Sequence, residues 1–157
     1  MRAAGAGAAI LGVCGGLQML GLELRDPTGL EGGDITGLGL LDVTTTLAAD
    51  KITRQRSIAW DGGSIEGYEI HHGRTEPGPF AEPWLPDGLG WRQGNVFGVY
   101  AHGLLDNGPY RQWFLEHLGW QGRAEDWAVA IDAAINQVAA LVTESGWAEH
   151  LERSLDR

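Results

Sequence analysis

The stretch Ile10–Gly21, ILGVCGGLQMLG, contains the only cysteine of the 157-residue chain, Cys14. An apolar run suited to a buried strand precedes it, and a helical pattern follows from Leu17. A nucleophile on a sharp, glycine-flanked turn between a strand and a helix forms a nucleophile elbow, and GVCGG fits the cysteine form of that pattern, G-x-C-x-G. Amides at the start of a helix lower the pKa of a thiol. The pattern predicts acyl transfer by Cys14, with the amide of Gly15 facing the oxyanion.

The same cysteine has a structural interpretation. Free cysteine is among the most buried residue types, and G-x-C-x-G is a weak motif in a chain with 25 glycines. Read by itself, the motif leaves both a nucleophile and a buried thiol open.

Histidines follow in two further segments, GYEIHHGRT from Gly67 and GVYAHGLLDN from Gly98. His102 comes directly after a predicted strand and is a candidate general base, although isolated histidines at such positions are commonly structural. His71 and His72, with Glu69, have the residue types of a zinc site. Adjacent strand residues point to opposite faces, so these histidines are poorly arranged for one ion and no metal site is predicted.

The elements that must position these residues alternate between strand and helix patterns, which predicts an α/β protein with one domain over residues 1–157. A Gly94-Asn95 pair predicts a hairpin. Pro109 begins a predicted helix that Gly119 ends. An apolar stripe at helical spacing predicts a last helix packed in the core. The expected segments are strands 8–13, 65–72, 89–93 and 96–101, a strand entered near residue 40, loops 25–37 and 75–90, and helices from 17, from 109 and over 125–143.

Composition narrows the functional classes. A net charge of −10 and a pI near 4.8 argue against nucleic acid or an anionic membrane as a partner. No apolar run approaches the roughly 18 residues that span a bilayer. A single cysteine forms no internal disulfide, which favours a cytoplasmic location.

Three strings in order, GVCGGLQMLG, GYEIHHGRT and GVYAHGLLDN, resemble the C-terminal glutaminase domain of cobyric acid synthases, which are class I, triad-type glutamine amidotransferases. The resemblance implies a flavodoxin-like three-layer α/β fold. It implies that Cys14 attacks the side-chain amide of glutamine to form a thioester and that His102 transfers protons. Substrate-binding roles fall to Gly15 and Gln18, and site-shaping roles to Tyr68, Glu69 and His71.

The resemblance also implies partners. Ammonia passes to a synthetase domain that uses ATP and magnesium to amidate the carboxylates of a corrinoid. That domain is absent from this chain, and no cofactor or metal is expected in the glutaminase domain itself.

Two departures from the family pattern bear on activity. Leu104 occupies the place of the glutamate that orients the histidine in many triad enzymes, so a Cys14–His102 dyad is expected. Only 13 residues precede Cys14, too few for the strand–helix units that come first in the family. The sequence therefore predicts a domain incomplete at its N-terminus, an unpaired edge at strand 8–13, and little glutaminase activity in isolation.

Other functions stay open. One is a catalytically incomplete fragment or paralogue that acts as a binding or assembly module. Another is the related amidotransferase that acts on a peptidoglycan precursor, and a third is a cysteine hydrolase of the α/β-hydrolase type.

Overall fold

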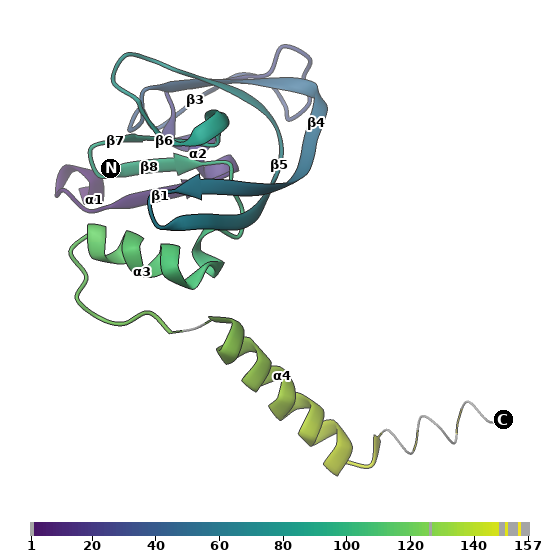
Figure 1. The fold of residues 1–157 in the computed structure, drawn as a ribbon. Coiled ribbons are helices and arrows are strands. Elements are labelled where there is room, and N and C mark those ends of the chain that lie inside the picture. Colours follow the sequence, from purple (N-terminus) through teal and green to yellow (C-terminus); the bar gives the residue numbers. More distant parts are fainter. Residues whose placement is uncertain (1, 126, 148–149, 151–153, 155–157) are drawn as a thin grey trace. The chain divides into compact units, whose positions relative to one another are not determined.

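The structure is a computed structural model that describes residues 2–125, 127–147, 150 and 154. Figure 1 shows the elements. In chain order they are α1 (Arg2–Gly5), β1 (Ile10–Val13), α2 (Gly15–Leu20), β2 (Glu23–Arg25), β3 (Ile35–Thr36), β4 (Val43–Trp60), β5 (Gly63–Pro77), β6 (Glu82–Leu85), the 3-10 helix η1 (Pro86–Gly88), β7 (Gly90–Gln93), β8 (Val96–Val99), the 3-10 helix η2 (Leu104–Asp106), α3 (Gly108–His117) and α4 (Trp127–Glu144).

The chain divides into two compact units, residues 1–110 and residues 111–157. All eight strands lie in the first unit, and α4 lies in the second. The prediction of one domain over residues 1–157 stays a prediction. No helix of the described residues is long and apolar enough to cross a membrane.

The first sheet carries the predicted strand–elbow–helix segment. Its strand order is β1-β8-β7-β6, with β1 parallel to β8 and β8 antiparallel to β7. The hairpin between β7 and β8 turns at Gly94, whose φ of +57° is a conformation that glycine adopts at little cost. Among the described strands, β1 stands at the end of this order, as the predicted edge requires.

The second sheet has the order β3-β2-β4-β5 and contains a long bent ribbon formed by β4 and β5 (Figure 1). The two strands pair from Val43–Pro77 to Trp60–Gly63, with a register shift between Leu47 and Ile52. The predicted strand 65–72 is therefore the middle of a strand of 15 residues.

The predicted loop over residues 75–90 is wrong. Strand β5 continues to Pro77, and β6 pairs with β7 through Pro83–Trp91. Proline lacks the N–H that a central strand needs, but it is tolerated at a strand end and on an edge strand. Pro77 is the last residue of β5 and Pro83 lies on edge strand β6, so neither proline marks a loop.

The core of the first unit joins α2 to both sheets. Leu17 is 0% exposed and Phe97 of β8 is 1% exposed. A Cβ on Gly98 would lie 2.8 Å from Leu41 Cδ2 and 3.0 Å from Leu17 Cγ, so the missing side chain lets both leucines pack on β8. This packing fixes α2, and with it the turn at Cys14, against the sheet.

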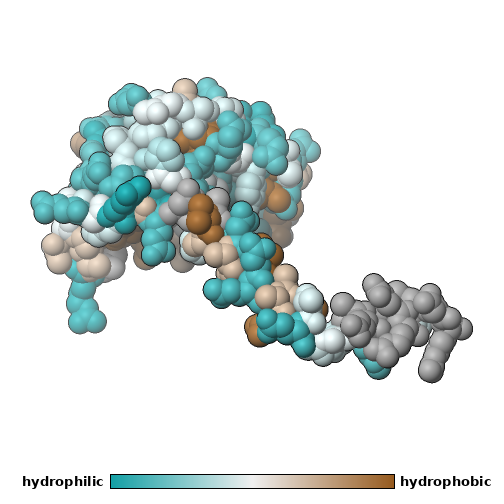
Figure 2. Space-filling view, turned by 60° about the horizontal axis from the view of Figure 1, so that its bottom comes forward, coloured by the Kyte–Doolittle hydropathy of each residue, from teal (hydrophilic) through white to brown (hydrophobic). Residues whose placement is uncertain are grey.

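Helix α4 confirms the predicted last helix but not its predicted burial. Its apolar side chains are exposed in the described structure, for example 59% of Ile135 and 60% of Val138. Figure 2 shows hydrophobic residues on its surface. Helical spacing identifies an apolar face, but it does not identify what covers that face.

Candidate active site

Cys14 occupies a strained turn between β1 and α2. Its backbone has φ 52° and ψ −112°, and α2 begins at the next residue, Gly15. Among the described residues, only Cys14 and Asp87 combine a side chain with a positive φ. The Cys14 amide donates to the Val99 carbonyl at 2.8 Å, which ties the turn to the end of β8. A strained, positive-φ residue between a strand and a helix is the geometry of a nucleophile elbow.

Gly12 allows the strand and helix of this turn to approach each other. A Cβ at Gly12 would lie 2.6 Å from both the backbone carbon and the carbonyl oxygen of Gly16. Since backbone atoms cannot move aside as a flexible side chain can, this position requires glycine.

The Cys14 thiol lies beside β5. Its Sγ is 3.5 Å from the Ile70 carbonyl oxygen, to which it can donate, and the residue is partly exposed. The thiol is therefore neither deeply buried nor part of a disulfide.

His102 is held against the same strand. Its amide donates to the Tyr68 carbonyl at 2.8 Å, and the Tyr68 amide donates to the His102 carbonyl at 3.2 Å. The two rings are stacked, with centroids 4.8 Å apart and planes 6° apart. His102 Nε2 is buried and has no hydrogen-bond partner among the described residues. The backbone bonds and the ring stacking thus hold His102 against β5.

Strand β5 brings Cys14 and His102 to neighbouring positions. Tyr68 and Ile70 are two residues apart, so their backbone polar groups face the same edge of the strand. His102 pairs with Tyr68 on that edge, and Cys14 meets the carbonyl of Ile70. The two residues implied to be catalytic therefore stand side by side along one edge of β5.

Gln18 belongs to a buried polar network behind the cysteine. Its Nε2 donates to the Tyr100 hydroxyl at 3.4 Å, and that hydroxyl is 2.7 Å from Thr75 Oγ1. Thr75 Oγ1 is also 2.7 Å from Thr45 Oγ1. Burial raises the pKa of Tyr100, so it stays a neutral phenol. The network holds Gln18 in place on α2, four residues after Cys14.

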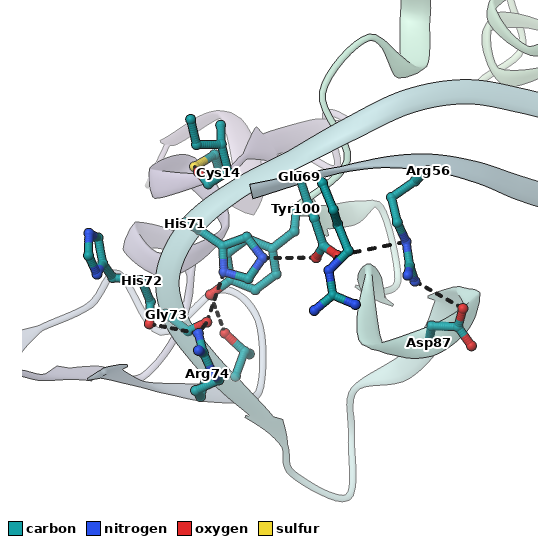
Figure 3. Close-up of polar contacts among 12 residues, drawn as sticks. Cys14, Arg56, Glu69, His71, His72, Gly73, Arg74, Asp87 and Tyr100 are labelled. Atoms are coloured by element: carbon teal, nitrogen blue, oxygen red, sulfur yellow. Dashed lines mark hydrogen bonds and ion pairs between the residues drawn. The ribbon is translucent and has the colours of Figure 1, made fainter. Parts of the chain in front are cut away.

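Glu69 and His71 lie on the other face of β5 from Tyr68, as strand alternation requires. Figure 3 shows the His71 ring against the Tyr100 ring, whose centroids are 3.6 Å apart, with Glu69 beside it. His71 Nδ1 is 2.9 Å from the Gly73 carbonyl and Nε2 is 3.1 Å from Glu69 Oε2. Both ring nitrogens of His71 therefore face oxygen atoms, one of the backbone and one of a carboxylate.

Two arginines complete this cluster. Arg54 Nε is 2.9 Å from Glu69 Oε1, and Arg56 Nε is 3.7 Å from the same oxygen. Arg56 also reaches Asp87 Oδ2 at 2.9 Å (Figure 3). Neither arginine was predicted as a site residue, although the alternation in T-R-Q-R places them on one face of a strand.

The adjacent histidines His71 and His72 make separate contacts. His72 turns away from His71, with Nδ1 3.0 Å from the Ala48 carbonyl. Within the described part of the chain, no group of three histidine, cysteine or acidic side chains could hold a metal ion.

The fold and the elbow define a class of proteins. The structure is similar to one described as "Crystal structure of glutamine amidotransferase", with a TM-score of 0.58 and 23% identity over 76% of this chain and 66% of that chain. The likeness shows the fold, and it confirms the predicted flavodoxin-like α/β class.

The chain belongs to the CobB/CobQ-like glutamine amidotransferase domain family, whose model matches residues 1–110. Those residues are also the first compact unit. The chain is 45% identical over 150 residues to a cobyric acid synthase from Deinococcus radiodurans, and 41% identical over 160 residues to one from Caulobacter sp.. The matches cover 90% and 96% of this chain, but only 31% of each relative. The chain therefore spans about a third of these relatives.

Proposed function

We propose that this chain is a glutaminase domain that releases ammonia from glutamine through a thioester on Cys14. The observation that carries the proposal is the placement of the elbow cysteine and His102 on one edge of β5. Membership of the amidotransferase family supports it.

The chemistry begins with a proton transfer. The Cys14 thiol turns from the Ile70 carbonyl and gives its proton to His102, whose buried Nε2 has no hydrogen-bond partner among the described residues. The sulfur then forms a bond to the amide carbon of glutamine, and the carbonyl electrons move onto oxygen. The amide of Gly15 supplies a hydrogen bond to this oxyanion. Hydrogen bonds of catalytic pairs commonly shorten only when substrate is bound.

The second half of the reaction releases ammonia and glutamate and restores the free thiol of Cys14. The carbon–nitrogen bond breaks as His102 returns its proton to the leaving nitrogen, which departs as ammonia and leaves a γ-glutamyl thioester. Water then attacks the thioester while His102 accepts a proton, and glutamate and the free thiol result. In this scheme His102 transfers protons in both halves, and Tyr68 acts as a positioning residue through ring stacking.

The remaining roles belong to the same proposal. Gln18 braces the elbow or contacts glutamine, and Glu69 and His71 shape the strand that carries Tyr68. The ammonia is consumed by an ATP- and magnesium-dependent synthetase domain that amidates the carboxylates of a corrinoid. The relatives are cobyric acid synthases, and this chain spans about a third of their length; both facts support that assignment.

Covalent labelling tests the proposal. A glutamine-mimicking diazoketone, 6-diazo-5-oxo-L-norleucine, should add once per chain at Cys14, and excess L-glutamine should protect the site. Replacement His102→Asn should slow labelling by about 10²- to 10⁴-fold, as expected for loss of a general base. The matched control His72→Asn should leave the rate unchanged. A Cys14 that reacts no faster than a small free thiol, with no protection by glutamine, would contradict the proposal and favour a binding module.

A further inference from the structure

A cavity of about 330 Å³ lies beside the elbow. Its lining includes Gly15, Gln18, Met19, Glu31, Ile35 and Leu38. Pockets for small ligands begin at about 300 Å³, so the volume suits a single amino acid. Gly15 is the residue directly after Cys14, so the cavity begins one residue from the elbow cysteine.

The walls match the parts of glutamine that do not react. Two methylene groups separate the amide carbon of glutamine from its α-carbon, and Met19, Ile35 and Leu38 offer apolar surface to such a chain. At the α-carbon glutamine carries an ammonium group, which requires a hydrogen-bond acceptor and prefers a charged one. Glu31 is the only charged residue in the described lining of the cavity.

We propose that this cavity holds the amino-acid end of glutamine and that the Glu31 carboxylate binds the α-ammonium group. The inference rests on the proposed glutaminase function. It assigns a specificity role to a residue outside the matched strings: Glu31 distinguishes glutamine from amides that lack the amino group.

Asp26 holds the loop that carries Glu31. Its carboxylate is 5% exposed and accepts hydrogen bonds from the amides of Leu30 at 2.8 Å, Glu31 at 2.7 Å and Gly33 at 3.1 Å. The Asp26 amide in turn donates to Asp34 Oδ1 at 2.6 Å. These bonds fix the Glu31 backbone, and a specificity residue on a loop requires such support.

The ionisation of Asp26 agrees with this bracing role. The amide of Glu31 is the largest influence that lowers the pKa of Asp26 below 3.8, and it outweighs the opposing effect of burial. Asp26 is therefore a charged acceptor at neutral pH, and its lone pairs are directed to the loop. Glu31, by contrast, is an exposed residue that lines the cavity.

Equilibrium binding tests the inference without requiring turnover. In a Cys14→Ser background, calorimetry would measure Kd for L-glutamine and for 4-carbamoylbutanoate, which is glutamine without its amino group. Replacement Glu31→Gln should weaken glutamine binding by about tenfold or more, a loss of about 1.4 kcal/mol. It should leave the Kd of 4-carbamoylbutanoate within about twofold, since that ligand has no ammonium group to lose.

The control is Glu76→Gln, an exposed glutamate of β5 outside this cavity, which should change neither Kd. Equal weakening of both ligands by Glu31→Gln would show a structural role and overturn the inference. Unchanged glutamine binding would overturn it as well, while labelling of Cys14 by the diazoketone would still uphold the proposed function. Absence of both glutamine binding and glutamine-protected labelling would reject both.

Discussion

Backbone groups of β5 organise the reacting residues. The Ile70 carbonyl receives the Cys14 thiol, and Tyr68 exchanges two backbone hydrogen bonds with His102. Because these contacts involve main-chain atoms, the role of Ile70 cannot be predicted from a pattern of side-chain types. The sequence could predict Cys14 from its glycines and His102 from its string, but not the strand edge where they meet.

Gly67 offers a test at the residue scale. A Cβ there would lie 2.4 Å from the His102 carbonyl oxygen, closer than real contacts allow. Gly67→Ala should therefore displace His102 and slow diazoketone labelling of Cys14 by about tenfold or more, because even small misplacement of a reacting group is costly. Circular dichroism should show a folded chain. The matched control Gly108→Ala has nothing within 4 Å of its new Cβ, so its Cys14 should be labelled at the wild-type rate. Equal labelling rates for Gly67→Ala and wild type would contradict a role for the close approach of Gly67 to His102.

At the scale of elements, the elbow depends on close packing between β1 and α2. Gly12→Ala would place a Cβ 2.6 Å from backbone atoms of Gly16 and 2.5 Å from Leu20 Cδ1. Overpacking of this kind costs about 1–3 kcal/mol, so the free energy of unfolding in urea should fall by that amount.

Gly16→Ala is the comparison for this change, because its Cβ meets nothing within 4 Å. Alanine also favours a helix over glycine by about 1 kcal/mol. Gly16→Ala should therefore be neutral or stabilising, and a loss of stability equal to that of Gly12→Ala would argue against the packing explanation.

The loop that carries Glu31 has a predictable pH response. Since the pKa of Asp26 in the folded chain lies below its ordinary value of 3.8, ionised Asp26 stabilises the folded state. That stabilisation is complete above the unfolded pKa and is lost as pH falls through the folded pKa. Urea unfolding from about pH 5 down to about pH 2.5 should show a steeper loss of stability for wild type than for Asp26→Asn. Parallel curves for the two proteins would exclude this role for Asp26.

Elements with strong local signals were predictable, and elements defined by pairing were not. The Gly94-Asn95 hairpin and the helix after Pro109 are present where turn and cap residues place them. Strand β6 was missed because Pro83 and the prolines before and after it resemble a loop, and among the described strands it pairs with β7 alone. The length of the β4–β5 ribbon likewise follows from cross-strand pairing, which single-strand patterns do not record.

For the whole molecule, the family match and the first compact unit have the same limits, residues 1–110. The elbow, His102 and the proposed glutamine cavity all lie within it. The sequence of α4 predicts an apolar face, but it does not predict what covers that face, because an amphipathic helix does not specify its partner. The family could be predicted, since three ordered strings carry more information than one motif.

The most direct test of the central claim is detection of the thioester itself. Protein mixed with L-glutamine and quenched in acid should carry a γ-glutamyl group on Cys14 by intact-mass and peptide analysis. Neutral hydroxylamine should remove the group as γ-glutamyl hydroxamate, and Cys14→Ser should never acquire it. Release of ammonia from glutamine with no adduct on Cys14, and at an equal rate in Cys14→Ser, would contradict the assignment of Cys14 as the nucleophile.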